Sequence, residues 1–301
     1  MRSARKQKPT GSPKFLKFII LGFLIVAIWI FLVLDTKYWN GTDKFDYVYR
    51  MENGDVAVMV LDPELSESTS LIIPGDTQVS VAGNYGTLRI KNVWQLGLNE
   101  KVGGRLLAAT TTKNFLMPTF LWSDSDIASV ENVNLFQILK FIFIPKNTNI
   151  PIGDRVSFVA FSLRVKNINR TTIDLAKSQF LKKTNLSDGQ MGYVLLGPVS
   201  GRLTNIFSDN DFSNQNVRVN IVDATGVAGS ANIIGQIIEV IGGKVVSVDK
   251  KPVQSDTDCL VLGANKKIVK KIATLFGCKI SGDKSSFDLE IRLGELFANR
   301  Y

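Results

Sequence analysis

One turn near the end of the chain carries residue types that can hold an anion. Asp223, Thr225 and Gly226 follow a strand-like run, and Gly229 comes just before residues with helical spacing. Backbone N–H groups at a helix N-terminus can bind a phosphate, so a sugar phosphate or an anionic polymer could dock here. The alternative is structural: Gly226 supplies a positive φ, and Gly229 lets the helix approach the sheet closely. The loop lacks the lysine or arginine that phosphate loops usually add, which favours the structural alternative.

A second turn places a carboxylate and a hydroxyl after an apolar run. Asp76 and Thr77 follow Pro74 and Gly75, and the run before them has the composition of a strand. Such side chains can contact a ligand. They are also the ordinary residues of turns and helix caps, because their oxygen atoms accept hydrogen bonds from nearby backbone N–H groups. Asp76 and Thr77 are therefore candidate binding residues with a structural alternative.

The reactive side chains are few. The chain has no histidine, so the commonest general base and the commonest neutral metal ligand are missing, and a Ser-His-Asp triad is excluded. We expect no cofactor and no metal site. The two cysteines, Cys259 and Cys278, begin strand-like runs on either side of one helix, so either a disulfide or a pair of buried thiols fits them.

The helix between the cysteines has a basic side. Lys266, Lys267, Lys270 and Lys271 crowd one face of it, and apolar residues occupy the other. Such a face can meet an anionic polymer or lipid headgroups. More often it is simply solvated.

An apolar run near the start predicts a membrane anchor. Residues 18–34 contain no charge, and with Phe15 and Leu16 the run reaches about twenty residues, enough to cross a hydrocarbon core of roughly 30 Å. We therefore predict a transmembrane helix at residues 15–34 and a juxtamembrane stalk at 35–46, with Tyr38 and Trp39 at the lipid interface. The stretch after the run has no small-residue cleavage site, which favours an anchor over a cleaved signal peptide.

The charge distribution sets the orientation of that anchor. The formal net charge is +9, and six lysines and arginines precede the uncharged run, where no acidic residue occurs. The positive-inside rule then predicts a cytoplasmic tail at residues 1–14 and an extracytoplasmic location for the rest. Removing those six charges from +9 leaves +3, so no nucleic-acid partner is expected.

The remainder has the pattern of an α+β protein. Residues 47–204 are predicted as a β-rich domain with some helices, including strands at 139–144 and 156–165 and a helix at 171–183. A polar linker is expected at 205–215. Residues 216–301 predict a small β-α-β-β-α-β domain with helices on a sheet.

The last domain resembles a known family. Residues 217–231, VRVNIVDATGVAGSA, are similar to the opening of the LytR C-terminal domain, where a strand leads through an Asn-rich turn and two spaced glycines into a helix. The similarity continues through CLVLG at 259–263 to DLEIRLG at 288–294. Asp223 stands where the family usually has Asn, a mild departure because both residues tolerate left-handed backbone and cap helices.

The upstream domain resembles a catalytic one. Residues 71–79, LIIPGDTQV, look like the Ile-Pro-Arg-Asp-Thr signature of the LytR-CpsA-Psr (LCP) family, which transfers undecaprenyl-linked glycopolymers to the cell wall. In that family arginines and aspartates grip a pyrophosphate and a divalent ion. Here the signature arginine is Gly75, which removes two charge-assisted hydrogen bonds and a positive charge from a dianionic site. The family's later arginine-rich motif is also missing, so we expect a degenerate LCP-like domain.

These observations predict a membrane-anchored extracytoplasmic protein of the cell envelope that binds or scaffolds without catalysis. Its expected partners are the lipid bilayer and either an anionic wall glycopolymer or another envelope protein. The alternative is an active LCP-type phosphotransferase that attaches lipid-linked glycopolymer to the cell wall. A mutually coordinated set of arginines and acids around Asp76 would favour that alternative.

Overall fold

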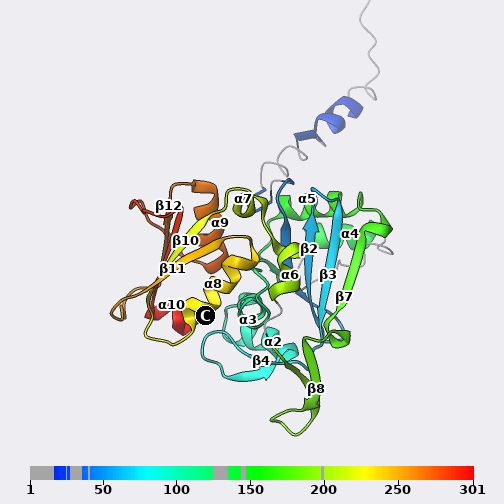
Figure 1. Ribbon diagram of the computed structural model, residues 1–301. Coiled ribbons are helices and arrows are strands. Elements are labelled where there is room, and N and C mark those ends of the chain that lie inside the picture. The colour runs from blue at the N-terminus through cyan, green and yellow to red at the C-terminus, as the bar shows by residue number, and fades with distance from the viewer. Residues whose placement is uncertain are drawn as a thin grey trace, which may run out of the picture.

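The computed structural model describes residues 17–24, 26–27, 36–39, 41–124, 135–143, 147–197 and 200–301. Within this part the chain has mixed α+β structure, which confirms the predicted class. Two five-stranded sheets stand on opposite sides of the molecule, and several helices lie between them (Figure 1).

The first sheet has the strand order β6-β1-β2-β3-β7. Its three central strands pair antiparallel, and β6 and β7 add to the two edges in parallel. Every residue of β2 except the last is buried, as expected of a central strand covered on both faces. The strand bounds are β1 Phe45–Arg50, β2 Val56–Asp62, β3 Glu67–Ile73, β6 Trp122–Ser123 and β7 Arg170–Asp174.

Helices and two small hairpins surround this sheet. One face of the sheet joins the larger apolar core, and the other carries an aromatic cluster that includes Tyr47, Tyr49 and Phe158. The remaining elements of this part are β4 Gln78–Ser80, β5 Thr87–Arg89, α2 Ile90–Asn99, α3 Arg105–Phe115, α4 Leu135–Phe143, α5 Ile152–Ser162, β8 Leu181–Asn185 and β9 Met191–Leu195, with two short 3-10 turns, η2 Asn167–Asn169 and η3 Leu175–Lys177.

Three local predictions in this part were wrong. The sequence predicts strands at 139–144 and 156–165, but the described residues there belong mainly to α4 and α5. Their apolar side chains, rich in Phe, Ile and Val, resemble those of a strand, yet Phe141 of α4 and Phe158 of α5 contact each other within the aromatic cluster of the sheet. The helix predicted at 171–183 is instead β7, η3 and the start of β8, because β7 pairs with β3. The upstream part is therefore less β-rich than expected.

The second sheet has the order β11-β10-β14-β12-β13. Helices α8 and α9 cover the face that looks toward the first sheet (Figure 1). The element order is the predicted β-α-β-β-α-β pattern, with the short β13 before the last strand and a final helix α10 after it. The bounds are β10 Arg218–Ala224, α8 Ser230–Val240, β11 Lys244–Lys250, β12 Cys259–Gly263, α9 Lys266–Phe276, β13 Lys279–Ile280, β14 Leu289–Gly294 and α10 Glu295–Arg300.

The segment predicted as a linker has regular structure at both ends. Helix α6, Ser200–Phe207, extends into it, and helix α7, Asn210–Ser213, follows. Phe207 and Phe212 are buried in the apolar core that both sheets share. Residues 205–215 therefore pack tightly against both parts of the molecule.

The predicted membrane span is described only in part. Residues 17–24 and 26–27 are helical, and the other residues of 15–34 lie outside the described ones, as does the predicted tail at 1–14. No helix among the described residues combines the length and apolarity needed to cross a bilayer.

The segment that follows is fixed to the folded body. Asp154, which is 0% exposed in the first turn of α5, accepts hydrogen bonds from the backbone N–H groups of Lys37, Tyr38 and Trp39 at 3.0–3.3 Å. Trp39 is buried against Phe45 rather than placed at a lipid interface as predicted. Residues 36–39 therefore pack on the protein and do not form a free stalk.

This anchoring predicts a large effect of Asp154→Ala. The substitution removes a buried acceptor and leaves three N–H groups short of a partner, so the free energy of unfolding should fall by about 3 kcal/mol. Urea unfolding of the full chain in detergent micelles, followed by tryptophan fluorescence, measures the change. The exposed Asp256→Ala should change it by less than about 0.5 kcal/mol. Equal losses in the two variants would show that Asp154 anchors nothing.

Candidate functional site

The turn between β3 and β4 gathers a group of ions around Asp76. The Asp76 carboxylate lies 2.6 Å from Lys91 Nζ and 2.8 Å from Arg89 Nη1. Arg89 also donates two hydrogen bonds to Asp188, at 2.7 and 3.0 Å, and one to the carbonyl of Met191. Strand β5 and helix α2 supply the two cations, and the β8–β9 turn supplies Asp188. Two cations and two carboxylates thus neutralise one another.

The pairing shifts the ionisation of this group. Hydrogen bonds from Lys91 and Arg89 lower the pKa of Asp76 below its ordinary value. Arg89 lowers the pKa of Asp188 from 3.8 to about 2, and the two carboxylates raise the pKa of Arg89 in return. These shifts keep Asp76, Asp188 and Arg89 charged at neutral pH.

Gly75 sits where a side chain cannot fit. A Cβ added there would lie 2.4 Å from the carbonyl oxygen of Gly54 and 3.2 Å from the Cβ of Lys91. The Gly75 N–H also donates to Asp55 at 2.7 Å, which holds the turn against the β1–β2 hairpin. The position of the signature arginine is therefore closed by backbone.

The divalent ion implied by the resemblance does not suit these residues. Asp76 and Asp188 are both already paired with cations at 2.6–2.8 Å, and a metal would have to displace them. Among the described residues no group of three or more acidic, histidine or cysteine side chains is placed to hold a metal. Thr77 is fully buried, and its N–H donates to the carbonyl of Pro74, so it acts in the turn.

The 223–229 turn has the structural features of a tight connection. Asp223 Oδ1 accepts from the N–H and the hydroxyl of Thr225 at 3.1 and 2.6 Å. Gly226 and Gly229 have φ values of +72° and +89°. A Cβ on Gly229 would meet nothing within 4 Å, so its role is the positive φ and not the close approach that we predicted. The Asp223 carboxylate brings negative charge to the loop, which weakens the case for an anion site.

A disulfide joins Cys259 and Cys278. Cys259 is the first residue of β12, and Cys278 directly follows Gly277, the C-cap of α9. The bridge therefore fixes α9 on its sheet, which sets the direction in which the lysines of that helix point.

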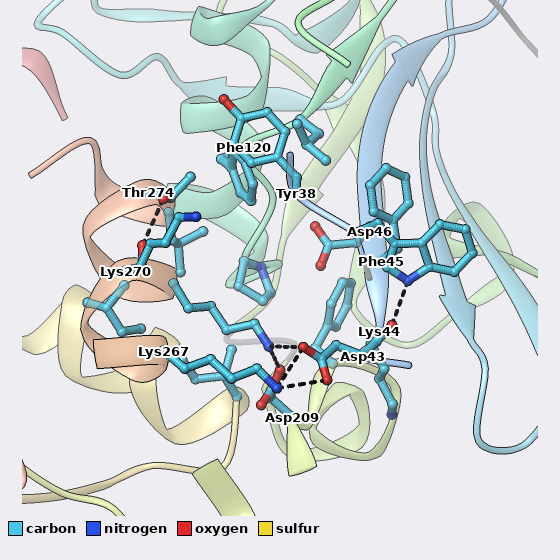
Figure 2. Close-up of a pocket in the computed structure, with 18 of the residues that line it drawn as sticks. Tyr38, Asp43, Lys44, Phe45, Asp46, Phe120, Asp209, Lys267, Lys270 and Thr274 are labelled. Carbon is cyan, nitrogen blue, oxygen red and sulfur yellow. Dashed lines mark hydrogen bonds and ion pairs between the residues drawn. The ribbon is translucent and has the colours of Figure 1, made fainter. Parts of the chain in front are cut away.

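A cavity of about 290 Å³ lies between the two parts of the molecule. Residues 36–39, β1, the 118–121 segment and α9 form its walls (Figure 2). Apolar walls come from Tyr38, Phe120, Phe207 and Leu275, and five lysines and three aspartates also line it. Nothing in the sequence had joined residues 36–46 to α9, which lies more than two hundred positions later.

Ion pairs close one side of this cavity. Lys267 contacts Asp43 at 3.0 Å (Figure 2). Lys267 also contacts Asp211 at 2.7 Å, and Lys271 contacts Asp209 and, at 3.9 Å, Asp43. Two lysines of the basic helix face are therefore paired with carboxylates of the molecule, although Lys267 stays half exposed to solvent.

Asp46 on β1 is the unusual group of the cavity. Its carboxylate points toward the interior, on the side opposite Lys270 (Figure 2). In the part of the chain that the structure describes, its Oδ1 is buried without a hydrogen-bond partner. Burial raises the pKa of Asp46 to about 7; nearby Lys271 lowers it and Asp209 raises it. Sequence reasoning missed this residue because its neighbours carry no motif.

No family model matches this chain. No curated protein matches it either. Among solved structures, B. subtilis TagT has a TM-score of 0.36 at 11% identity, covering 53% of this chain and 87% of that one. B. subtilis TagV has a TM-score of 0.34 at 11% identity, covering 67% and 99%. A further TagT structure, described as a LytR-CPS2A-psr family protein with bound octaprenyl pyrophosphate lipid, has a TM-score of 0.32 at 12% identity, covering 53% and 87%. Similarity at this level assigns no fold and no activity to the chain.

The closed backbone at position 75 predicts that even a methyl group is costly there. Gly75→Ala should lower the free energy of unfolding by about 1–3 kcal/mol, because the Gly54 carbonyl must move. Urea unfolding measures the loss. Gly282→Ala is the control, since a Cβ at Gly282 meets nothing within 4 Å. A neutral Gly75→Ala would show that the turn can open for a side chain.

The ion group around Arg89 predicts a pH-dependent contribution to stability. The folded pKa of Asp188 is depressed, so its contribution is present above about pH 4 and is lost as the pH falls toward its folded pKa of about 2. The difference in unfolding midpoint between the native chain and Asp188→Asn should be largest at neutral pH and disappear near pH 2. Asp256→Asn should show no such trend. A difference for Asp188→Asn that persists unchanged at pH 2 would exclude the ion pair as its cause.

Proposed function

We propose that this chain is a membrane-anchored extracytoplasmic protein of the cell envelope that binds a wall glycopolymer or an envelope partner without catalysing transfer. Residues 15–34 would hold it in the cytoplasmic membrane with its N-terminus in the cytoplasm. The folded part would work on the wall side. The disulfide between Cys259 and Cys278 suits such an oxidising location.

The ion pairs around Asp76 are the observation that supports binding without catalysis. A pyrophosphate needs cations that face it, yet Lys91 and Arg89 are already neutralised by Asp76 and Asp188. The backbone closure at Gly75 excludes the additional arginine of the LCP signature. A dianionic substrate would have to break the existing pairs before it gained its own, and that cost opposes binding.

The same cluster is also the observation that favours the alternative. Arg89, Lys91, Asp76 and Asp188 are mutually coordinated, as we expected for an LCP-type phosphotransferase on lipid-linked glycopolymer. In that case Arg89 and Lys91 would turn from the carboxylates to the phosphates. The two proposals therefore differ in whether these pairs open for a substrate.

An activity measurement on the full chain in membrane vesicles separates them. Given a polyprenyl-pyrophosphate-linked glycan and Mg²⁺, the native chain should release no polyprenyl phosphate and transfer no glycan. Vesicles that carry it should nevertheless retain added wall polymer above the level of vesicles without it.

Arg89→Ala is the matched variant for this measurement. If the chain is not an enzyme, the variant and the native chain give the same zero rate. Turnover by the native chain that Arg89→Ala abolishes would overturn the proposal and establish the phosphotransferase.

Protease added to spheroplasts should remove the folded part, and its protection would refute the extracytoplasmic location.

A further inference from the structure

The cavity between β1 and α9 has the size of a small headgroup. Its volume of about 290 Å³ is at the lower end of the range for small-molecule sites. An extended polymer therefore does not fit within it. A compact polar group on an apolar tail does, because aromatic and aliphatic side chains form much of the wall.

The cavity also has one buried acceptor without a donor and two exposed lysines without an ion pair, one of which, Lys37, lies over the Tyr38 ring at 5.0 Å. Asp46 Oδ1 is buried without a hydrogen-bond partner. Among the described residues, Lys37 and Lys270 line the cavity and form no ion pair, whereas the other three lining lysines do. Asp46 could accept a hydrogen bond from a cationic group, and Lys37 and Lys270 could pair with an anionic one. A zwitterionic ligand has both groups.

The position of the cavity indicates where such a ligand comes from. Thr36 lines it and stands two positions after Leu34, the end of the predicted membrane span. Two residues of extended chain reach about 7 Å, so the cavity would lie at the surface of the bilayer if the span is embedded. This step rests on the membrane anchoring in the proposed function.

We propose that this cavity binds the headgroup of a membrane phospholipid that carries a primary amine and a phosphate, such as phosphatidylethanolamine. The ammonium donates to the carboxylate of Asp46, the phosphate lies with Lys37 and Lys270, and the start of the acyl region meets Tyr38 and Phe120. Burial raises the pKa of Asp46, and an ammonium beside it would stabilise the charged form.

Other headgroups satisfy fewer of these groups. A choline headgroup has a cation but no N–H donor for Asp46. A glycerol headgroup has hydroxyl donors, but its net negative charge lies near the unpaired carboxylate. The recognition should therefore depend on Asp46 for the choice of amine and on Lys270 for the phosphate common to all three lipids.

Native mass spectrometry of the full chain, released from detergent micelles with equal amounts of phosphatidylethanolamine, phosphatidylcholine and phosphatidylglycerol of the same chain length, tests this. The native chain should retain the ethanolamine lipid about tenfold more than the choline lipid, the effect of about one charge-assisted hydrogen bond. Asp46→Asn should abolish that preference, and Lys270→Ala should reduce retention of the ethanolamine and choline lipids alike.

Lys266→Ala is the matched control, because Lys266 is an exposed neighbour on the same helix and does not line the cavity. It should behave as the native chain. Asp46→Asn removes the charge of this carboxylate with little change of shape, and a cooperative urea transition with a midpoint at or above that of the native chain shows that it folds.

Equal retention of the three lipids, or a preference that survives Asp46→Asn, would overturn the proposal. So would retention of soluble phosphoethanolamine without retention of the lipid. The measurement is made in micelles, so a failure here leaves the envelope location standing. A chain that proves to be outside any membrane would remove the source of the lipid even if the cavity binds it.

Discussion

The hydrogen bonds from Lys37, Tyr38 and Trp39 to Asp154 fix the point at which the chain joins its folded body. A carboxylate with no solvent exposure needs such donors, and three backbone N–H groups in sequence provide them. Next to that join, Trp39 packs on Phe45 just before β1 pairs with β2, and residues 36–39 form one wall of the cavity. The site between the two parts is a consequence of this early placement.

The sequence predicted best where one periodicity dominates. In residues 216–301 the alternation of Val217, Val219 and Ile221 and the helical spacing of Ile234, Ile237 and Ile238 led to the observed element order. The prediction failed at α4 and in the second half of α5, where most residues are apolar and a helix cannot be distinguished from a strand without knowing the surface that it covers. That surface is an aromatic sheet face built by residues almost a hundred positions earlier.

The roles of the candidate residues could be predicted only where their partners are close in the sequence. Turns such as 223–226 and 74–77 organise themselves through hydrogen bonds between residues two or three apart, so their structural roles could be inferred from type and spacing. The partners of Asp76 come from β5 and α2, and those of Lys267 come from residues 43 and 211. Such pairs depend on tertiary contacts between distant segments, and Asp46 becomes unusual only once its surroundings exclude water.

The pairing of Lys267 with Asp43 also gives the chain a mechanical property. The C-terminal sheet is joined covalently to the rest through residues 205–215 and is held a second time, by ions, at the segment where the folded body begins. The polypeptide is thereby closed into a ring, and a pulling force applied at the N-terminal end reaches α9 directly. Since ions screen exposed charges over about 8 Å at physiological ionic strength, the stiffness of this ring would depend on the salt around it.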